Sequence, residues 1–158
     1  MPSFSARSIA RLQGVHKKLV ELALTVVKHF DCTVQEGGGA RTLEEQRAKV
    51  LAGLSQTLDS KHVVTPERPK AEAMDLAPYP VRWPKWPKLP SGMTAEMRSE
   101  LDTYVDEVAR WHYFGGYVLG TADQLSITLR WGGDWSGTRD PKDNKFDDWG
   151  HFELADPL

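Results

Sequence analysis

The stretch Asp148-Trp149-Gly150-His151-Phe152-Glu153-Leu154 decides how the fold is completed. Residues 150–154 are predicted to return as a final strand, and Asp148 lies three positions before His151. A turn or a bent strand at this point can hold the carboxylate and the imidazole near one metal ion. This pair predicts metal chemistry, provided that further ligands come from elsewhere in the chain.

Three earlier segments have the composition of strands. Residues 32–35 are short and β-prone, residues 73–77 carry Asp75, and residues 126–131 alternate between apolar and polar side chains. Five prolines between Pro78 and Pro90 make a helix or a central strand nearly impossible there.

Three segments are predicted to be helical. Residues 8–29 carry apolar side chains at spacings of three, four and seven, which is typical of one amphipathic helix. A second helix begins at the capping box of Thr42 and Glu45. A third begins near Thr94, and we expect Gly115-Gly116 to break or kink it. Helices and short strands without a βαβ period predict a small α+β domain, an antiparallel sheet packed with helices.

Length and composition set limits on the whole protein. The 158 residues are 40% hydrophobic, which predicts a single domain spanning residues 1–158. The net charge of −2 gives no reason to expect nucleic acid as a partner. The sequence has no apolar run long enough to insert into a membrane and no signal peptide at its start. A single cysteine, Cys32, excludes an intramolecular disulfide and a thiolate-rich metal site.

Two histidines and one aspartate supply the candidate metal ligands. His62, Asp75 and His151 would fill three positions of a zinc tetrahedron and leave one open for water. A zinc ion can lower the pKa of such a water from about 15.7 towards about 7. Asp148 is then predicted to act as general base on the water and as general acid on a leaving amine.

Two further residues are candidates for holding the substrate. Arg41 follows a glycine loop and precedes a helix, so its guanidinium can stabilise an oxyanion or bind a carboxylate. Ser60 lies two positions before His62 and can hydrogen-bond the substrate. Taken singly, each of these residues also has an ordinary structural interpretation, such as a surface histidine, a helix-start arginine or a loop hydroxyl.

Taken together, the motifs are far more specific. Their order along the chain resembles that of the M15 metallopeptidases, and the start resembles phage endolysins of the L-alanyl-D-glutamate endopeptidase type. The similar blocks are residues 4–16, 36–46 (EGGGARTLEEQ), 55–62 (SQTLDSKH), 71–76 (AEAMDL), 130–135 (RWGGDW) and 146–154 (FDDWGHFEL). The resemblance implies the α+β fold shared with D-Ala-D-Ala carboxypeptidases and the hedgehog signalling domain.

The resemblance also implies roles for individual residues. Zinc would be bound by His62, Asp75 and His151, with Asp148 as the acid/base and Arg41 as the substrate or oxyanion contact. One departure is that His62 and Asp75 are thirteen positions apart, a longer step than the family usually has. We interpret this as an inserted surface loop over residues 64–70, which costs little free energy. Glu67 and Glu72 are the alternative carboxylates.

The expected function is zinc-dependent hydrolysis of an amide bond in the stem peptide of peptidoglycan, between L-Ala and D-Glu, during host lysis. One alternative is a D,D- or L,D-carboxypeptidase on the same scaffold. Another is a metal-bearing binding domain without turnover, although Asp148 beside the ligands argues against it. We expect a monomer without a separate wall-binding domain, made in the host cytoplasm without a signal peptide and acting on the cell wall.

Overall fold

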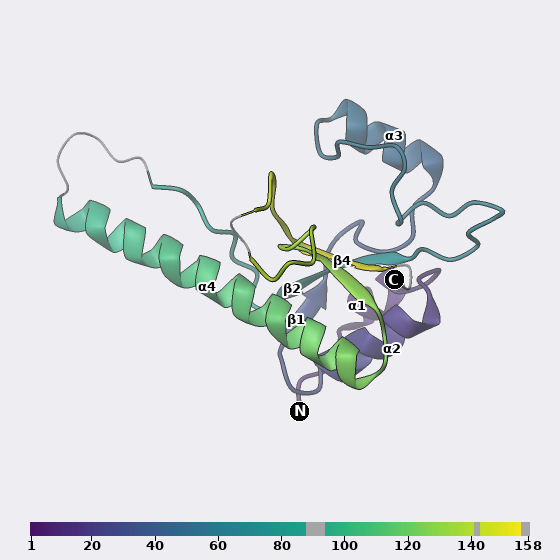
Figure 1. The fold of residues 1–158 in the computed structure, drawn as a ribbon, viewed down its shortest axis with the longest axis horizontal. Coiled ribbons are helices and arrows are strands. Elements are labelled where there is room, and N and C mark those ends of the chain that lie inside the picture. The colour runs from purple at the N-terminus through teal and green to yellow at the C-terminus, as the bar shows by residue number, and fades with distance from the viewer. Residues whose placement is uncertain (88–93, 141–142, 156–158) are drawn as a thin grey trace.

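A four-stranded antiparallel sheet, with strand order β1-β2-β4-β3, forms the centre of the molecule (Figure 1). The computed structural model describes residues 1–87, 94–140 and 143–155. Its elements, in chain order, are α1 (Ala6–Arg11), α2 (Lys17–Val26), β1 (Cys32–Val34), α3 (Leu43–Leu51), β2 (Ala73–Pro78), α4 (Ala95–Gln124), β3 (Leu129–Gly132) and β4 (Asp148–Leu154). The predicted α+β class and the antiparallel sheet are confirmed.

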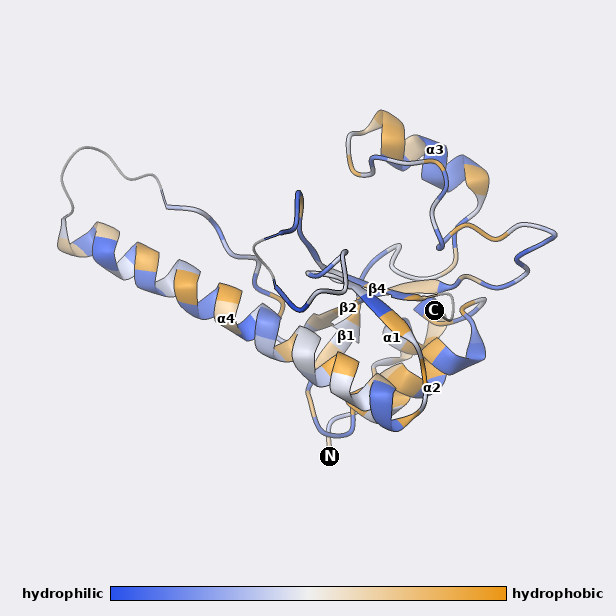
Figure 2. Ribbon diagram, in the orientation of Figure 1, coloured by the Kyte–Doolittle hydropathy of each residue, from blue (hydrophilic) through white to orange (hydrophobic). Residues whose placement is uncertain are grey.

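Two helices, α2 and α4, pack on the sheet and enclose the core. Leu19 and Leu22 of α2, Phe114 and Val118 of α4, and Phe152 of β4 are completely buried. Figure 2 shows apolar residues on α2 and along the length of α4, part of which lies beside the sheet. The apolar spacing over residues 8–29 therefore predicted the core-facing side of α2, where Leu19, Ala23 and Val26 are buried.

The N-terminal helix expected over residues 8–29 is wrong in one respect, because the chain forms two helices with a turn between them. Gly14 adopts a positive φ of 81°, which is not a helical conformation, and His16 caps the start of α2. The backbone of this turn pairs with Ala71, which accepts from the His16 N–H at 2.8 Å and donates to the Gly14 carbonyl at 2.9 Å. Hydrogen bonds to a distant part of the chain therefore take the place of helical hydrogen bonds at Gly14 and His16.

The break expected at Gly115-Gly116 is also wrong, since α4 is continuous from Ala95 to Gln124. The two glycines lie inside the helix, and Gly115 packs against the ring of Trp131. A Cβ added at Gly115 would lie 2.4 Å from a carbon of that ring. Glycine at this position allows the helix and β3 to approach closely, and it does not end the helix.

Most of the other predicted boundaries are close to those observed. The capping box of Thr42 and Glu45 is present at the start of α3. The strand expected over residues 126–131 is shorter and shifted, because Ser126 follows α4 with a positive φ of 55° and β3 begins at Leu129. Among the described residues, no helix combines the length and the apolar character that a membrane span requires.

Candidate metal centre and catalytic cavity

Strand pairing brings two of the predicted site residues together. In the antiparallel register of β2 and β4, Asp75 lies directly opposite His151. Neighbours in such a register have side chains on the same face of the sheet. The pairing of β2 with β4 therefore brings together two residues that are 76 positions apart in the sequence.

The third residue comes from a loop that is held by the backbone of the glycine-rich segment. The carbonyl of His62 accepts from the Arg41 N–H, and the carbonyl of Arg41 accepts from the Val64 N–H, both at 2.9 Å. The glycine segment is itself tied to β2, since the Asp75 N–H donates to the Gly38 carbonyl at 2.7 Å. This backbone pairing fixes His62 beside the sheet although it belongs to no strand.

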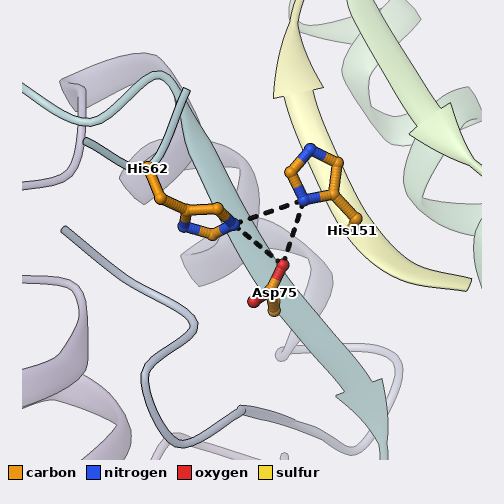
Figure 3. A group of neighbouring side chains, drawn as sticks. All are labelled: His62, Asp75 and His151. Carbon is orange, nitrogen blue, oxygen red and sulfur yellow. Dashed lines mark hydrogen bonds and ion pairs between the residues drawn. The ribbon is translucent and has the colours of Figure 1, made fainter. Parts of the chain in front are cut away.

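His62, Asp75 and His151 converge, as the sequence predicts (Figure 3). His62 Nε2 lies 3.0 Å from Asp75 Oδ1 and 3.3 Å from His151 Nδ1, and the latter atoms are 3.2 Å apart. Two ligand atoms at about 2.0–2.1 Å from a tetrahedral zinc ion are themselves about 3.3 Å apart. The three atoms have the donor types and the spacing that a zinc ion requires.

We call His62, Asp75 and His151 the triad. The ring nitrogens of the two histidines that point away from its centre have hydrogen-bond partners of their own. His62 Nδ1 donates to the Gly39 carbonyl at 2.8 Å, so that Nε2 presents its lone pair to the centre. His151 Nε2 donates to Glu153 Oε2 at 3.0 Å, which leaves Nδ1 facing the centre. Such bonds fix the orientation of ligating imidazoles. We did not predict a role for Glu153, although its position two residues after His151 on one strand face was a usable signal.

The ionisation of the triad follows from its surroundings. Burial alone would raise the pKa of Asp75, but the two imidazoles outweigh it and hold the pKa well below its usual range. Burial alone would lower the pKa of His151, yet hydrogen bonds with Asp75 and Glu153 raise it to about 9. Asp75, Glu153 and Asp148, whose negative charges favour a proton on His151, also favour a cation between His62, Asp75 and His151.

Asp148 lines the same cavity as the triad, which has a volume of about 760 Å³. The pairing of β3 and β4 shifts register between Trp131 and Gly132, so that Gly132 faces Asp148. This irregularity allows Asp148 and His151, an odd number of positions apart, to line one cavity. Burial, followed by the charge of Asp75, raises the pKa of Asp148 above its ordinary value.

Arg41 is largely buried and contacts the triad directly. Its Nη2 lies 2.9 Å from Asp75 Oδ2, and its Nε donates to the Gly37 carbonyl at 2.6 Å. Its Nη1 donates to Oε1 of Gln46 at 3.2 Å. Gln46 is fully buried, and its amide also donates to the Thr57 carbonyl at 2.8 Å. We did not single out Gln46, although it lies in the block of residues 36–46.

Ser60, Trp135 and Arg68 also line the cavity wall. Ser60 lies in the wall, and its hydroxyl accepts from the His62 N–H at 3.3 Å. Trp135 packs its ring 5.3 Å from that of His151. Arg68 is held by the carbonyls of Val63 and Ser60 at 3.1 and 2.8 Å. Neither Glu67 nor Glu72 belongs to the metal-facing group, which contains Asp75.

Comparisons with known proteins identify the family and a similar fold. The model of a family described as phage L-alanyl-D-glutamate peptidase matches residues 2–95. Among solved structures, the chain is similar to that of Serratia marcescens L-Ala D-Glu endopeptidase ChiX, at 26% sequence identity and a TM-score of 0.61. The alignment covers 98% of this chain and 91% of that one. A comparison with curated proteins found no match.

Proposed function

The chain belongs to the phage L-alanyl-D-glutamate peptidase family, and on that premise we propose that it cleaves peptidoglycan stem peptides between L-Ala and D-Glu with the aid of zinc. The observation that carries the proposal is the convergence of His62 Nε2, Asp75 Oδ1 and His151 Nδ1 within 3.0–3.3 Å, in a cavity that Asp148 also lines. A metal-bearing binding domain would have no need of a buried carboxylate beside its ligands.

The proposed zinc ligands are His62, Asp75 and His151. When bound, zinc polarises the scissile carbonyl and acidifies a water molecule. Asp148 takes a proton from the attacking water as the new C–O bond forms, and it gives that proton to the amine nitrogen as the C–N bond breaks. The raised pKa of Asp148 suits this exchange, because the carboxyl then holds a proton more readily than an exposed aspartate does.

Arg41 and Ser60 are proposed to hold the substrate. Three hydrogen bonds fix the guanidinium of Arg41, and two of its five N–H groups remain for an oxyanion or a carboxylate. The Ser60 hydroxyl accepts one bond from the backbone and can donate its own hydrogen to a substrate carbonyl.

Arg68 is our candidate for recognition of the D-Glu residue. It faces the cavity, and within residues 1–87, 94–140 and 143–155 no carboxylate lies at ion-pair distance from it. D-Glu is joined to the rest of the stem through its side-chain carboxyl, so its α-carboxylate is free beside the scissile bond. A guanidinium with fixed geometry suits a planar carboxylate.

The proposal extends to the whole protein. We propose that residues 1–158 act as one catalytic domain, as a monomer, on the cell wall of the host. The cavity wall then provides the contacts that select the substrate.

The test uses purified muropeptides and the zinc-loaded protein. Mass spectrometry should find a product that ends in L-Ala and a product that begins with D-Glu, and metal analysis should find one zinc per chain. Release of terminal D-Ala alone would point to the carboxypeptidase. Full zinc occupancy without any cleavage would point to the binding domain.

A further inference from the structure

A second cavity, of about 660 Å³, lies between the chain at residues 82–87 and the N-terminal half of α4. Figure 1 shows this half of α4 extending beyond the sheet, with the chain that follows β2 running beside it. Most of its lining residues are aromatic or charged, among them Arg82, Trp83, Lys85, Trp86, Glu100 and Tyr104. We call this cavity the indole groove.

Two tryptophans of the indole groove are unusually exposed. Trp83 is 46% exposed and Trp86 is 67% exposed. Trp83 stacks on Trp111 with ring centroids 4.3 Å apart, so the exposed part of Trp83 lies away from this contact. Trp86 meets Tyr104 edge-to-face at 4.9 Å. Large apolar side chains that gather on a surface beside charged residues are typical of a binding site.

The groove is also held in shape by polar contacts. The Trp111 indole N–H donates to the Arg82 carbonyl, and Arg110 donates to the Pro80 carbonyl, both at 2.8 Å. Arg82 and Glu107 form an ion pair at 3.5 Å. The indole faces are therefore presented by a braced segment, which lowers the entropic cost of binding a ligand.

Trp83 lines both the indole groove and the cavity that contains the triad and Asp148, which we call the catalytic cavity. It therefore connects the two. In peptidoglycan, the amino group of L-Ala is attached to the lactyl group of a muramic acid. One extended residue spans about 3.3–3.6 Å, so a cut after L-Ala places the sugar at the edge of the catalytic cavity. A ligand that reaches the scissile bond must bring its glycan into contact with one side of that cavity.

We propose that the indole groove binds the glycan strand of peptidoglycan, with the sugar that bears the stem peptide lying against Trp83 and the next along Trp86. Pyranose C–H groups pack on aromatic faces, and hydroxyl and acetamido groups hydrogen-bond charged side chains such as Arg82, Lys85 and Glu100. The inference rests on the proposed function and adds to it the part of the substrate that no peptide contact can recognise.

The kinetic test compares two substrates that share one scissile bond, a disaccharide tetrapeptide and the same tetrapeptide without sugar. For the unsubstituted protein, kcat/KM should be at least tenfold higher for the disaccharide form. Trp86→Ala should reduce this ratio at least fivefold. Tyr113→Ala, which removes another exposed aromatic of α4 that lines neither cavity, should leave the ratio unchanged. Equal ratios in the unsubstituted protein and Trp86→Ala would overturn the inference.

A binding test is independent of catalysis and separates the two proposals. Titration with a tetramer of N-acetylglucosamine should quench tryptophan fluorescence in a saturable way, and Trp86→Ala should weaken this binding at least fivefold. Saturable binding without cleavage of either substrate would refute the proposed function alone. Cleavage without any oligosaccharide binding would refute the glycan groove alone. Self-association that Trp86→Ala abolishes, with no sugar bound, would assign the groove to a second copy of the chain and overturn the inference.

Discussion

An imidazole can bind a metal through either ring nitrogen, and the partner of the other nitrogen decides which one is used. In His62, Nδ1 donates to the main-chain carbonyl of Gly39. In His151, Nε2 donates to the carboxylate of Glu153. Glu153 is in turn held by Arg130, whose Nε donates to it at 2.8 Å. The geometry of the candidate centre therefore depends on residues that lie outside the proposed ligand set.

Asp148 should be dispensable for metal binding and essential for turnover. Replacement Asp148→Asn keeps the size of the side chain but removes its capacity to accept and return a proton. We expect one zinc per chain and a kcat lowered by about 100-fold or more. Metal analysis and single-turnover kinetics measure the two quantities. His151→Ala is the matched variant and should lose both zinc and activity; an active Asp148→Asn, or a His151→Ala that still binds zinc fully, would contradict these roles.

Arg68 should set the preference for a free carboxylate beside the scissile bond. The unsubstituted protein is expected to cleave L-Ala-D-Glu peptides with a kcat/KM about 10–100-fold above that for peptides with D-isoglutamine, because a charge-assisted bond contributes about 1.5–3 kcal/mol. Arg68→Met should remove most of that preference, measured as the ratio for the two substrates.

The control for Arg68 is Arg98→Met, which removes an exposed arginine of α4 outside both cavities. This variant should keep the preference of the unsubstituted protein. A preference that survives in Arg68→Met would mean that another cation, such as Arg41, recognises the D-Glu carboxylate.

At the scale of elements, two neighbouring glycines of α4 test how closely this helix packs on β3, because only one of them contacts the strand. Gly116→Ala adds a methyl group to open space, where alanine favours the helix by about 0.5–1 kcal/mol. Gly115→Ala places the methyl group 2.4 Å from the Trp131 ring and should destabilise the fold by about 1–3 kcal/mol. Urea denaturation followed by circular dichroism gives both values. Equal effects at the two positions would show that β3 does not pack against α4 at Gly115.

At the scale of the whole molecule, the candidate metal centre joins three separate parts of the chain. Its proposed ligands come from a loop, from β2 and from β4. A metal ion that binds only the native state stabilises it by about 2.7 kcal/mol at a concentration 100 times its Kd. For a protein of this size, removal of zinc by a chelator should lower Tm by roughly 5–10 °C. His151→Ala should show no such shift, whereas an equal shift in that variant would place the stabilising metal elsewhere.

The candidate metal ligands could be named from the sequence because each lies within a short motif and the motifs occur in a recognisable order. The block around His151 and the ordered arrangement of the earlier blocks point to the ligand residues without a structure. The partners that orient them could not be named as easily. The Gly39 carbonyl carries no side-chain signal, and the role of Gln46 depends on a cavity wall that forms only when residues 36–57 fold together.

The amino-acid sequence alone predicted the class of fold and the capping of α3, because these depend on local periodicity and spacing, and it named the residues of the candidate centre through the order of their motifs along the chain. Only the tertiary structure decided that Gly14 interrupts the first predicted helix and that Gly115 lies within α4. It also decided that Arg41 is bound to Asp75. These features depend on contacts between residues far apart in the chain, and the free energy of such contacts outweighs local conformational preference.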